Sequence, residues 1–203
     1  MKKVTVALAA MAASVGLSSA AVLNLSVAST AGEIITADGV AAPTSTPVLV
    51  GTFADLGAID TSSYAAVLSS FTQFVAASGG DWIAPGFLNA NLMLDDSAPP
   101  VQGNVPDQLA VVIGDESPAG FAVVTNAGWV ADGFTDPPAP PNTVGMQVGI
   151  AANTYIWGAH DPAGGVTNPG AVPGAVVLRP VPEPGAGVLA LFATGLLFFR
   201  RRR

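Results

Sequence analysis

The sequence predicts a mainly β protein, with an antiparallel, sandwich-like body and one inserted amphipathic helix. Three observations predict this fold class. Short apolar runs are separated by turn residues, Gly and Pro are abundant (23 and 17 of 203 residues), and one segment alone shows helical spacing of its apolar residues. The chain has room for one domain of ordinary size plus processing segments at its two ends.

The predicted strands are short runs rich in Val and Ile that are bounded by turn-forming residues. They are VLVGTF (48–53), FLNANLML (87–94), QLAVVIGD (108–115), GFAVVTN (120–126), VGMQVGIAA (144–152), TYIWGA (154–159) and AVVLR (175–179). We expect about six or seven strands, with the helix inserted after the first. No internal repeat is visible, so a solenoid or propeller is not supported.

The predicted helix lies in the segment IDTSSYAAVLSSFTQFVAASGG. Its apolar residues form one helical stripe, which comprises Tyr64, Val67, Leu68, Phe71, Phe74 and Val75. Asp60, Thr61 or Ser62 can cap its start, and Gly79-Gly80 can end it. We expect this stripe to pack on the sheet and to bind no ligand.

The basic residues lie almost entirely at the ends of the chain. Six of the seven occupy positions 2–3 and 200–203, and Arg179 is the seventh, whereas all fourteen acids lie between residues 33 and 183. The body between the ends is therefore strongly acidic, which argues against binding of nucleic acid or anionic lipid by a basic patch. The chain has no cysteine, so disulfides and cysteine zinc sites are excluded.

The N-terminus has the order of a secretory signal peptide. Lys2 and Lys3 precede an apolar stretch, and Ser18-Ser19-Ala20 supplies the small residues that a signal peptidase reads. We expect a signal peptide over residues 1–20 with cleavage after Ala20, and cleavage after Ala31 is the alternative. A β-rich extracytoplasmic body (21–165) and a Pro/Gly-rich linker (166–180) follow.

The C-terminus combines a stiff segment, an apolar span and a cationic end. The two prolines of Val181-Pro182-Glu183-Pro184 hold this segment extended, in a shape suited to a protease cleft. Residues 185–199 carry no charge and would rise about 22 Å as a helix, which is short against a hydrocarbon core of roughly 30 Å. The arginines at 200–203 mark a cytoplasmic flank and can snorkel, so we expect a single transmembrane segment.

This order of Pro-Glu-Pro, short apolar span and terminal arginines resembles the PEP-CTERM sorting domain of exported proteins from Gram-negative bacteria that possess an exosortase. The resemblance implies a recognition motif followed by a membrane span at 185–199 and a retention cluster. The motif would be Val181, Pro182, Glu183 and Pro184, and the cluster would be Arg200, Arg201, Arg202 and Arg203.

The resemblance also implies partners and a destination. An exosortase and a signal peptidase would process the chain, which would be anchored transiently in the inner membrane. Its final place would be the cell surface or the exopolysaccharide of a biofilm matrix. The tail implies an address and no activity, and the body resembles no family closely enough to carry over a site.

Catalytic chemistry has few candidates in the body. A hydrolase would use His160 as base, Asp115 or Asp161 as its partner and Ser117 as nucleophile. The chain has no G-x-S-x-G elbow, and neighbouring side chains of a strand point to opposite faces, so His160 and Asp161 are not arranged as a dyad. We therefore predict no catalytic residues and interpret His160 as a loop residue.

Two binding hypotheses remain open. Clustered acids could supply oxygens to calcium, namely Asp95-Asp96, Asp115-Glu116 and Asp132 with Asp136, although no EF-hand loop is present and we expect no cofactor. Trp82, Trp129 and Trp157 could form a carbohydrate platform if they shared one exposed face, but partial burial is the ordinary state of tryptophan. We expect the body to be a non-enzymatic module that serves in interaction or structure, and we expect no nucleic-acid partner. The alternative is a secreted hydrolase that acts on matrix polymers.

Overall fold

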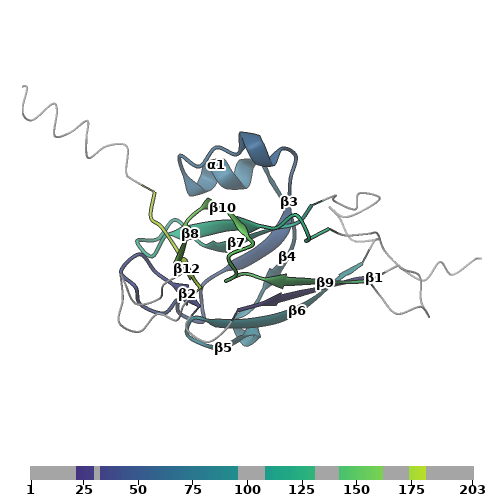
Figure 1. Cartoon of the computed structure of the whole chain (residues 1–203), viewed down its shortest axis with the longest axis horizontal. Helices are drawn as coiled ribbons and strands as arrows, with labels where there is room; N and C mark the ends of the chain where they lie inside the picture. Colours follow the sequence, from purple (N-terminus) through teal and green to yellow (C-terminus); the bar gives the residue numbers. More distant parts are fainter. Residues whose placement is uncertain (1–21, 30–32, 96–107, 131–141, 162–173, 182–203) are drawn as a thin grey trace, which may run out of the picture.

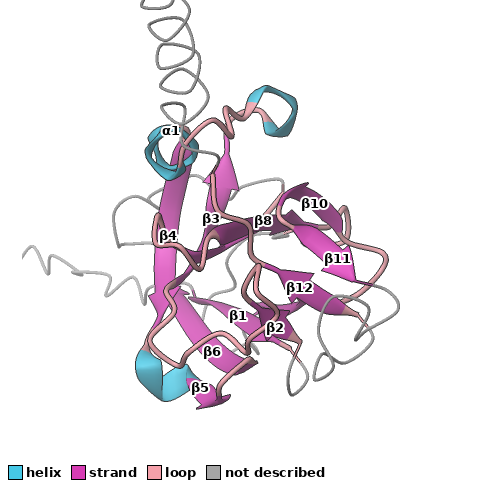
Figure 2. Cartoon of the chain, turned by 90° about the vertical axis from the view of Figure 1, so that its left-hand side faces the viewer, coloured by secondary structure: helices cyan, strands magenta, loops and turns pink. Residues whose placement is uncertain are grey.

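The computed structural model describes residues 22–29, 33–95, 108–130, 142–161 and 174–181 (Figure 1). Two sheets lie face to face, and a short helix covers the outer face of one of them (Figures 1 and 2). The four-stranded sheet has the order β5 (Trp82–Ala84), β6 (Phe87–Asp95), β1 (Val22–Ala28) and β9 (Asn142–Gln147). The five-stranded sheet has the order β10 (Thr154–Trp157), β8 (Phe121–Thr125), β7 (Ala110–Gly114), β3 (Val48–Phe53) and β4 (Phe71–Ala77).

A small third sheet lies beside the sandwich and holds the end of the described chain (Figure 2). Its order is β11 (Ala159–Asp161), β12 (Ala175–Val177) and β2 (Ile34–Ile35). The helical elements are α1 (Tyr64–Ser69) and two 3-10 turns, η1 (Leu56–Ala58) and η2 (Gly79–Asp81). Most strand pairs are antiparallel, but β1 pairs with β9, and β12 with β2, in parallel.

The main core lies between the two larger sheets. Alternate residues of β1 and β6 point into it, so that Leu23, Leu25 and Val27 are at most 1 % exposed. Val48 and Val50 meet them from the five-stranded sheet. The prediction of a mainly β, sandwich-like body is confirmed by this packing.

The five-stranded sheet also buries its other face. Val112 and Val123 form a second apolar cluster there with Val67 of α1. Phe121 belongs to the same cluster and is fully buried. The helix thus packs on a sheet, as the sequence predicts.

The extent of the predicted helix is wrong. Ser63 caps the start of α1 by accepting a hydrogen bond from the Ala66 N–H (3.0 Å). The helix ends at Ser69, and the hydroxyls of Ser69 and Ser70 donate hydrogen bonds to carbonyls of the last turn. The cap is therefore one residue beyond the predicted candidates. Phe71, Phe74 and Val75, which belong to the predicted helical stripe, instead lie on strand β4.

A β-bulge explains why the apolar residues of this strand have the spacing of a helix. Val75 pairs with Val50 but Gln73 pairs with Gly51, so Phe74 is the extra residue of the bulge. Phe74 and Val75 consequently both pack against the main core, while Phe71 packs against the second cluster. The resulting spacing of apolar residues equals helical spacing, although aromatic and β-branched residues suit a strand.

The strand predictions are confirmed in position but incomplete. All seven predicted runs contain a strand, although the run at 144–152 extends past the end of β9 at Gln147 and the run at 154–159 covers β10 and the start of β11. The described residues contain twelve strands instead of six or seven, because β1, β2, β4 and β5 were not predicted and β11 is separate from β10. The helix follows β3, the first predicted strand, but β1 and β2 precede β3 in the chain.

The boundary between the body and the linker changes as a result. Residues 175–179 lie inside the body, because β12 pairs with two strands and Leu178 is fully buried, so the expected linker over 166–180 is wrong in its last part. The signal peptide, most of the sorting segment and the arginine cluster lie outside the described residues. Within the described ranges, no helix has the length and apolar character to cross a membrane.

The close approach of β4 to Gly51 gives a direct test of the register. A Cβ on Gly51 would lie 2.1 Å from the Thr72 carbonyl oxygen, whereas a Cβ on Gly145 of β9 would meet nothing within 4 Å. We expect Gly51→Ala to lower the free energy of unfolding by about 1–3 kcal/mol or more. The matched control Gly145→Ala should change it by less than about 0.5 kcal/mol. Chemical denaturation measures both, and equal effects would contradict the register.

Candidate functional site

The last described residues are fixed to the body by backbone hydrogen bonds. The Leu178 N–H donates to the Ile35 carbonyl (2.8 Å), which continues the pairing of β12 with β2. One residue later, Arg179 and Phe121 exchange two bonds, with the Arg179 N–H donating at 3.0 Å and the Phe121 N–H at 3.1 Å. Both backbone polar groups of Arg179 are therefore occupied.

Side chains reinforce this attachment. The Trp157 indole N–H donates to the same Arg179 carbonyl (3.1 Å), and its ring stacks on Phe121 with centroids 5.8 Å apart. Gly120 lies under the chain with φ of 79°, where a Cβ would be 2.2 Å from the Arg179 carbonyl carbon. Val181 packs against the second apolar cluster. We call Gly120, Phe121 and Trp157, together with the residues 179–181 that lie against them, the clamp.

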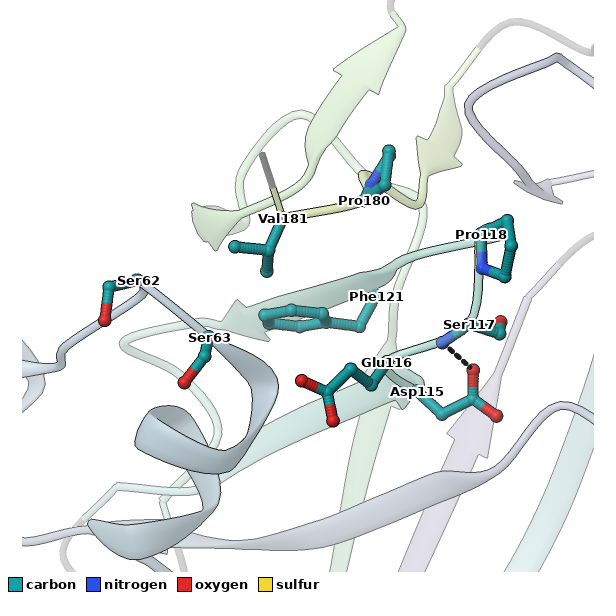
Figure 3. Close-up of a pocket in the computed structure, with 9 residues that line it drawn as sticks. All are labelled: Ser62, Ser63, Asp115, Glu116, Ser117, Pro118, Phe121, Pro180 and Val181. Carbon is teal, nitrogen blue, oxygen red and sulfur yellow. Dashed lines mark hydrogen bonds between the residues drawn. The ribbon is translucent and has the colours of Figure 1, made fainter. Parts of the chain in front are cut away.

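A pocket of about 600 Å³ opens beside the clamp (Figure 3). Figure 3 shows the Phe121 ring between Val181 and the acidic turn that joins β7 to β8. The described residues that line the pocket are Ser62, Ser63, Asp115, Glu116, Ser117, Pro118, Phe121, Pro180 and Val181. The pocket thus has an apolar floor and an acidic rim, and Val181, the last described residue, lines it.

Local hydrogen bonds fix the acidic rim. An Asp115 carboxylate oxygen accepts from the Ser117 N–H (2.9 Å), which is a turn-forming use of this aspartate. Glu116 is exposed. Tyr64 packs edge-on against Phe121 with centroids 5.2 Å apart, and burial together with the nearby Asp115 charge raises the pKa of Tyr64.

His160 does not join Asp115 and Ser117. It lies half-buried on β11, its ring stacks on Tyr155 with centroids 5.4 Å apart, and it is absent from the lining of the pocket. Asp161 is its neighbour on the same strand. The structure therefore does not bring together the serine, histidine and Asp115 considered for a hydrolase, and His160 lies on a strand and not in a loop.

The structure instead brings His160 near a buried glutamate that the sequence did not single out. Glu33 is only 3 % exposed, and its carboxylate accepts a hydrogen bond from the Gln147 side chain (3.3 Å). A Cβ built on Gly174 would lie within 4.0 Å of both His160 Nε2 and Glu33 Oε1. A Cβ on Gly149 would overlap the same carboxylate at 2.0 Å, so the lack of a side chain at Gly149 makes room for it.

Tyr155 completes this polar cluster. Its hydroxyl donates to the carbonyls of Val148 (2.8 Å) and Ile150 (3.3 Å). Burial, aided by the charge of Glu33, raises the pKa of Tyr155 to about 12. The cluster is thus a set of tightly packed polar groups that join β10, β11 and the residues before β2.

The remaining binding hypotheses have different outcomes. Trp82 and Trp129 are 6 % and 4 % exposed, so the tryptophan platform is wrong. Of the acids considered for calcium, Asp96, Asp132 and Asp136 lie outside the described residues. The same is true of Pro182, Glu183 and Pro184 of the predicted sorting motif. Among the acids and the histidine that the structure does describe, no group of three could hold a metal ion.

Comparison with known proteins identifies the C-terminal segment. Residues 180–203 match the PEP-CTERM protein-sorting motif, which confirms the resemblance that the sequence shows. The match begins at Pro180, inside the clamp. No curated protein and no solved structure matches the chain.

The raised pKa of Tyr155 predicts a loss of stability in alkaline solution. The folded state binds the phenolic proton more tightly than the unfolded state, whose tyrosine pKa is about 10, so this contribution is complete below pH 10 and is lost as the pH rises to about 12. We expect the free energy of unfolding to fall less steeply over this window in Tyr155→Phe than in the wild type. Denaturation at stepped pH measures the slope, with Tyr64→Phe as a comparison, and an unchanged slope in Tyr155→Phe would contradict the assignment.

Proposed function

Because the chain ends in a PEP-CTERM protein-sorting motif, we propose that it is an exported surface or matrix protein that an exosortase-like protease cuts at this motif. The match over residues 180–203 is the observation that carries the proposal. A motif of this kind implies an exported protein that is sorted through the membrane. We propose the cell surface or an exopolysaccharide matrix as its destination.

Two segments that lie outside the described residues serve export. Residues 1–20 act as the signal peptide, and residues 185–199 hold the chain in the inner membrane, with the arginines at 200–203 on the cytoplasmic side. The position of β1 supports signal cleavage after Ala20. Cleavage after Ala31 would remove β1, which is paired on both sides and supplies three buried core residues.

We propose that the body acts by interaction and not by catalysis. The outer face of its four-stranded sheet supports this role, since many of the side chains that β1, β6 and β9 present there carry amide or hydroxyl groups. Its outward side chains include Asn24, Ser26, Asn89, Asn91 and Thr143. Amide and hydroxyl groups can both donate to and accept from sugar hydroxyls.

Two further observations favour this face as a binding surface. Met93 is 70 % exposed, and no heavy atom lies within 4 Å of the Cβ position of Gly145, so the face is open at these points.

A hydrolase acting on matrix polymers is the alternative. Its support is the closeness of His160 to the Glu33 carboxylate, which could orient an imidazole. The burial of Glu33 and the packing of His160 on Tyr155 favour a structural role for the pair. We therefore prefer the interaction function.

Processing can be tested on protein isolated from the organism that encodes it. Intact-mass measurement should show a mature chain that begins near residue 21 and has lost the arginine cluster. We expect Glu183→Ala to leave the C-terminus uncut, because it removes the charged centre of the motif. A wild-type surface protein that still ends in four arginines would refute exosortase processing.

The task of the body can be tested with a glycan array probed by residues 21–181. If the open sheet face binds, Asn91→Ala should weaken binding about two- to tenfold, which is the effect of one lost hydrogen bond. His160→Ala should leave binding unchanged and serves as the control. Turnover of a glycan or ester that disappears in His160→Ala but persists in Asn91→Ala would establish the hydrolase instead.

A further inference from the structure

We infer that the clamp limits the access of the processing protease, so that cleavage of the sorting motif requires residues 179–181 to detach from the body. The inference rests on the proposed function, because it concerns the protease that reads the motif. It gives three residues of the body, Gly120, Phe121 and Trp157, a role in the cleavage of the sorting motif.

The first step is that the clamp and the predicted recognition motif share Val181, so no free chain separates the two. Arg179 is held by two backbone bonds and Val181 packs against the second apolar cluster. Pro182 is the next residue. At about 3.3–3.6 Å per residue, the three residues from Pro182 to Pro184 reach only about 10 Å beyond Val181 even when fully extended.

The second step concerns what a protease needs from its substrate. A peptide bound in extended form offers its backbone groups to the partner as an added strand would. The Arg179 N–H and carbonyl already bond to Phe121, and the carbonyl also accepts from Trp157. A protease that binds residues on the N-terminal side of a bond within 182–184 therefore competes with the body for the same groups.

The third step is that the clamp can open without unfolding the body. Arg179 and Pro180 have exposed side chains, and they follow β12 close to the end of the described residues. Local opening of such a terminal segment costs less than global unfolding. When opening and closing are fast, the rate of cutting follows the population of the open form.

Trp157→Phe in the full-length chain tests this inference. Phenylalanine keeps an aromatic ring against Phe121 but cannot donate to the Arg179 carbonyl, so the open form should become about two- to tenfold more populated. Pulse-labelling in the native organism should show precursor conversion that is faster by the same factor. Gly120→Ala, whose Cβ would displace Arg179 directly, provides a second variant that should also accelerate conversion.

A spacer separates the effect of the clamp from a general loss of stability. About six Gly and Ser residues inserted between Val181 and Pro182 give the protease free chain. Conversion of this spacer chain should exceed that of the wild type, and Trp157→Phe should no longer change it. Thermal unfolding of each mature product establishes that the body folds.

The outcomes distinguish this inference from the proposed function. If Glu183→Ala blocks conversion while neither clamp variant accelerates it, the clamp inference is refuted and the sorting function stands. Acceleration by Trp157→Phe that persists in the spacer chain would also refute it, since general destabilisation would then be the cause. If Glu183→Ala is converted like the wild type, the proposed function itself fails.

Discussion

The five-stranded sheet imposes the main constraint on this protein, because both of its faces are apolar. Every residue of β7 and β8 is buried, so each face of these strands needs a cover. The four-stranded sheet covers one face, whereas α1, Trp157 and Val181 cover the other. The end of the body is thus part of the second cover, and this requirement attaches the chain to the fold up to the start of the sorting motif.

Local patterns predicted much of this fold. Residues 87–94 alternate between buried and exposed as a half-covered strand requires, and the continuous apolar runs at 110–114 and 121–125 fit strands buried on both faces. The sequence misled at residues 71–75, where a bulge gives a strand the spacing of a helix. It was silent on the parallel pairing of β1 with β9, since strands more than a hundred residues apart carry no local sign of their partnership.

The sites divide in the same way. The sorting motif is linear, so three adjacent features of the sequence were enough to recognise it. The clamp depends on Trp157 and Phe121 of β8 both meeting Arg179, and no spacing along the chain indicates those contacts. Glu33 is an acid directly before two isoleucines, but its closeness to His160 arises from the pairing of β2, β12 and β11 in the third sheet.

The pairing of β1 bears on when this protein folds. An exported chain emerges N-terminus first, and its first described strand must wait for residues 89–95 and then 142–147 before both of its edges are paired. Contacts so distant in sequence form slowly, since much chain must be ordered before they are gained. The central strand therefore stays incomplete until most of the chain has crossed the membrane. Such an arrangement suits a secretory route that carries extended polypeptide.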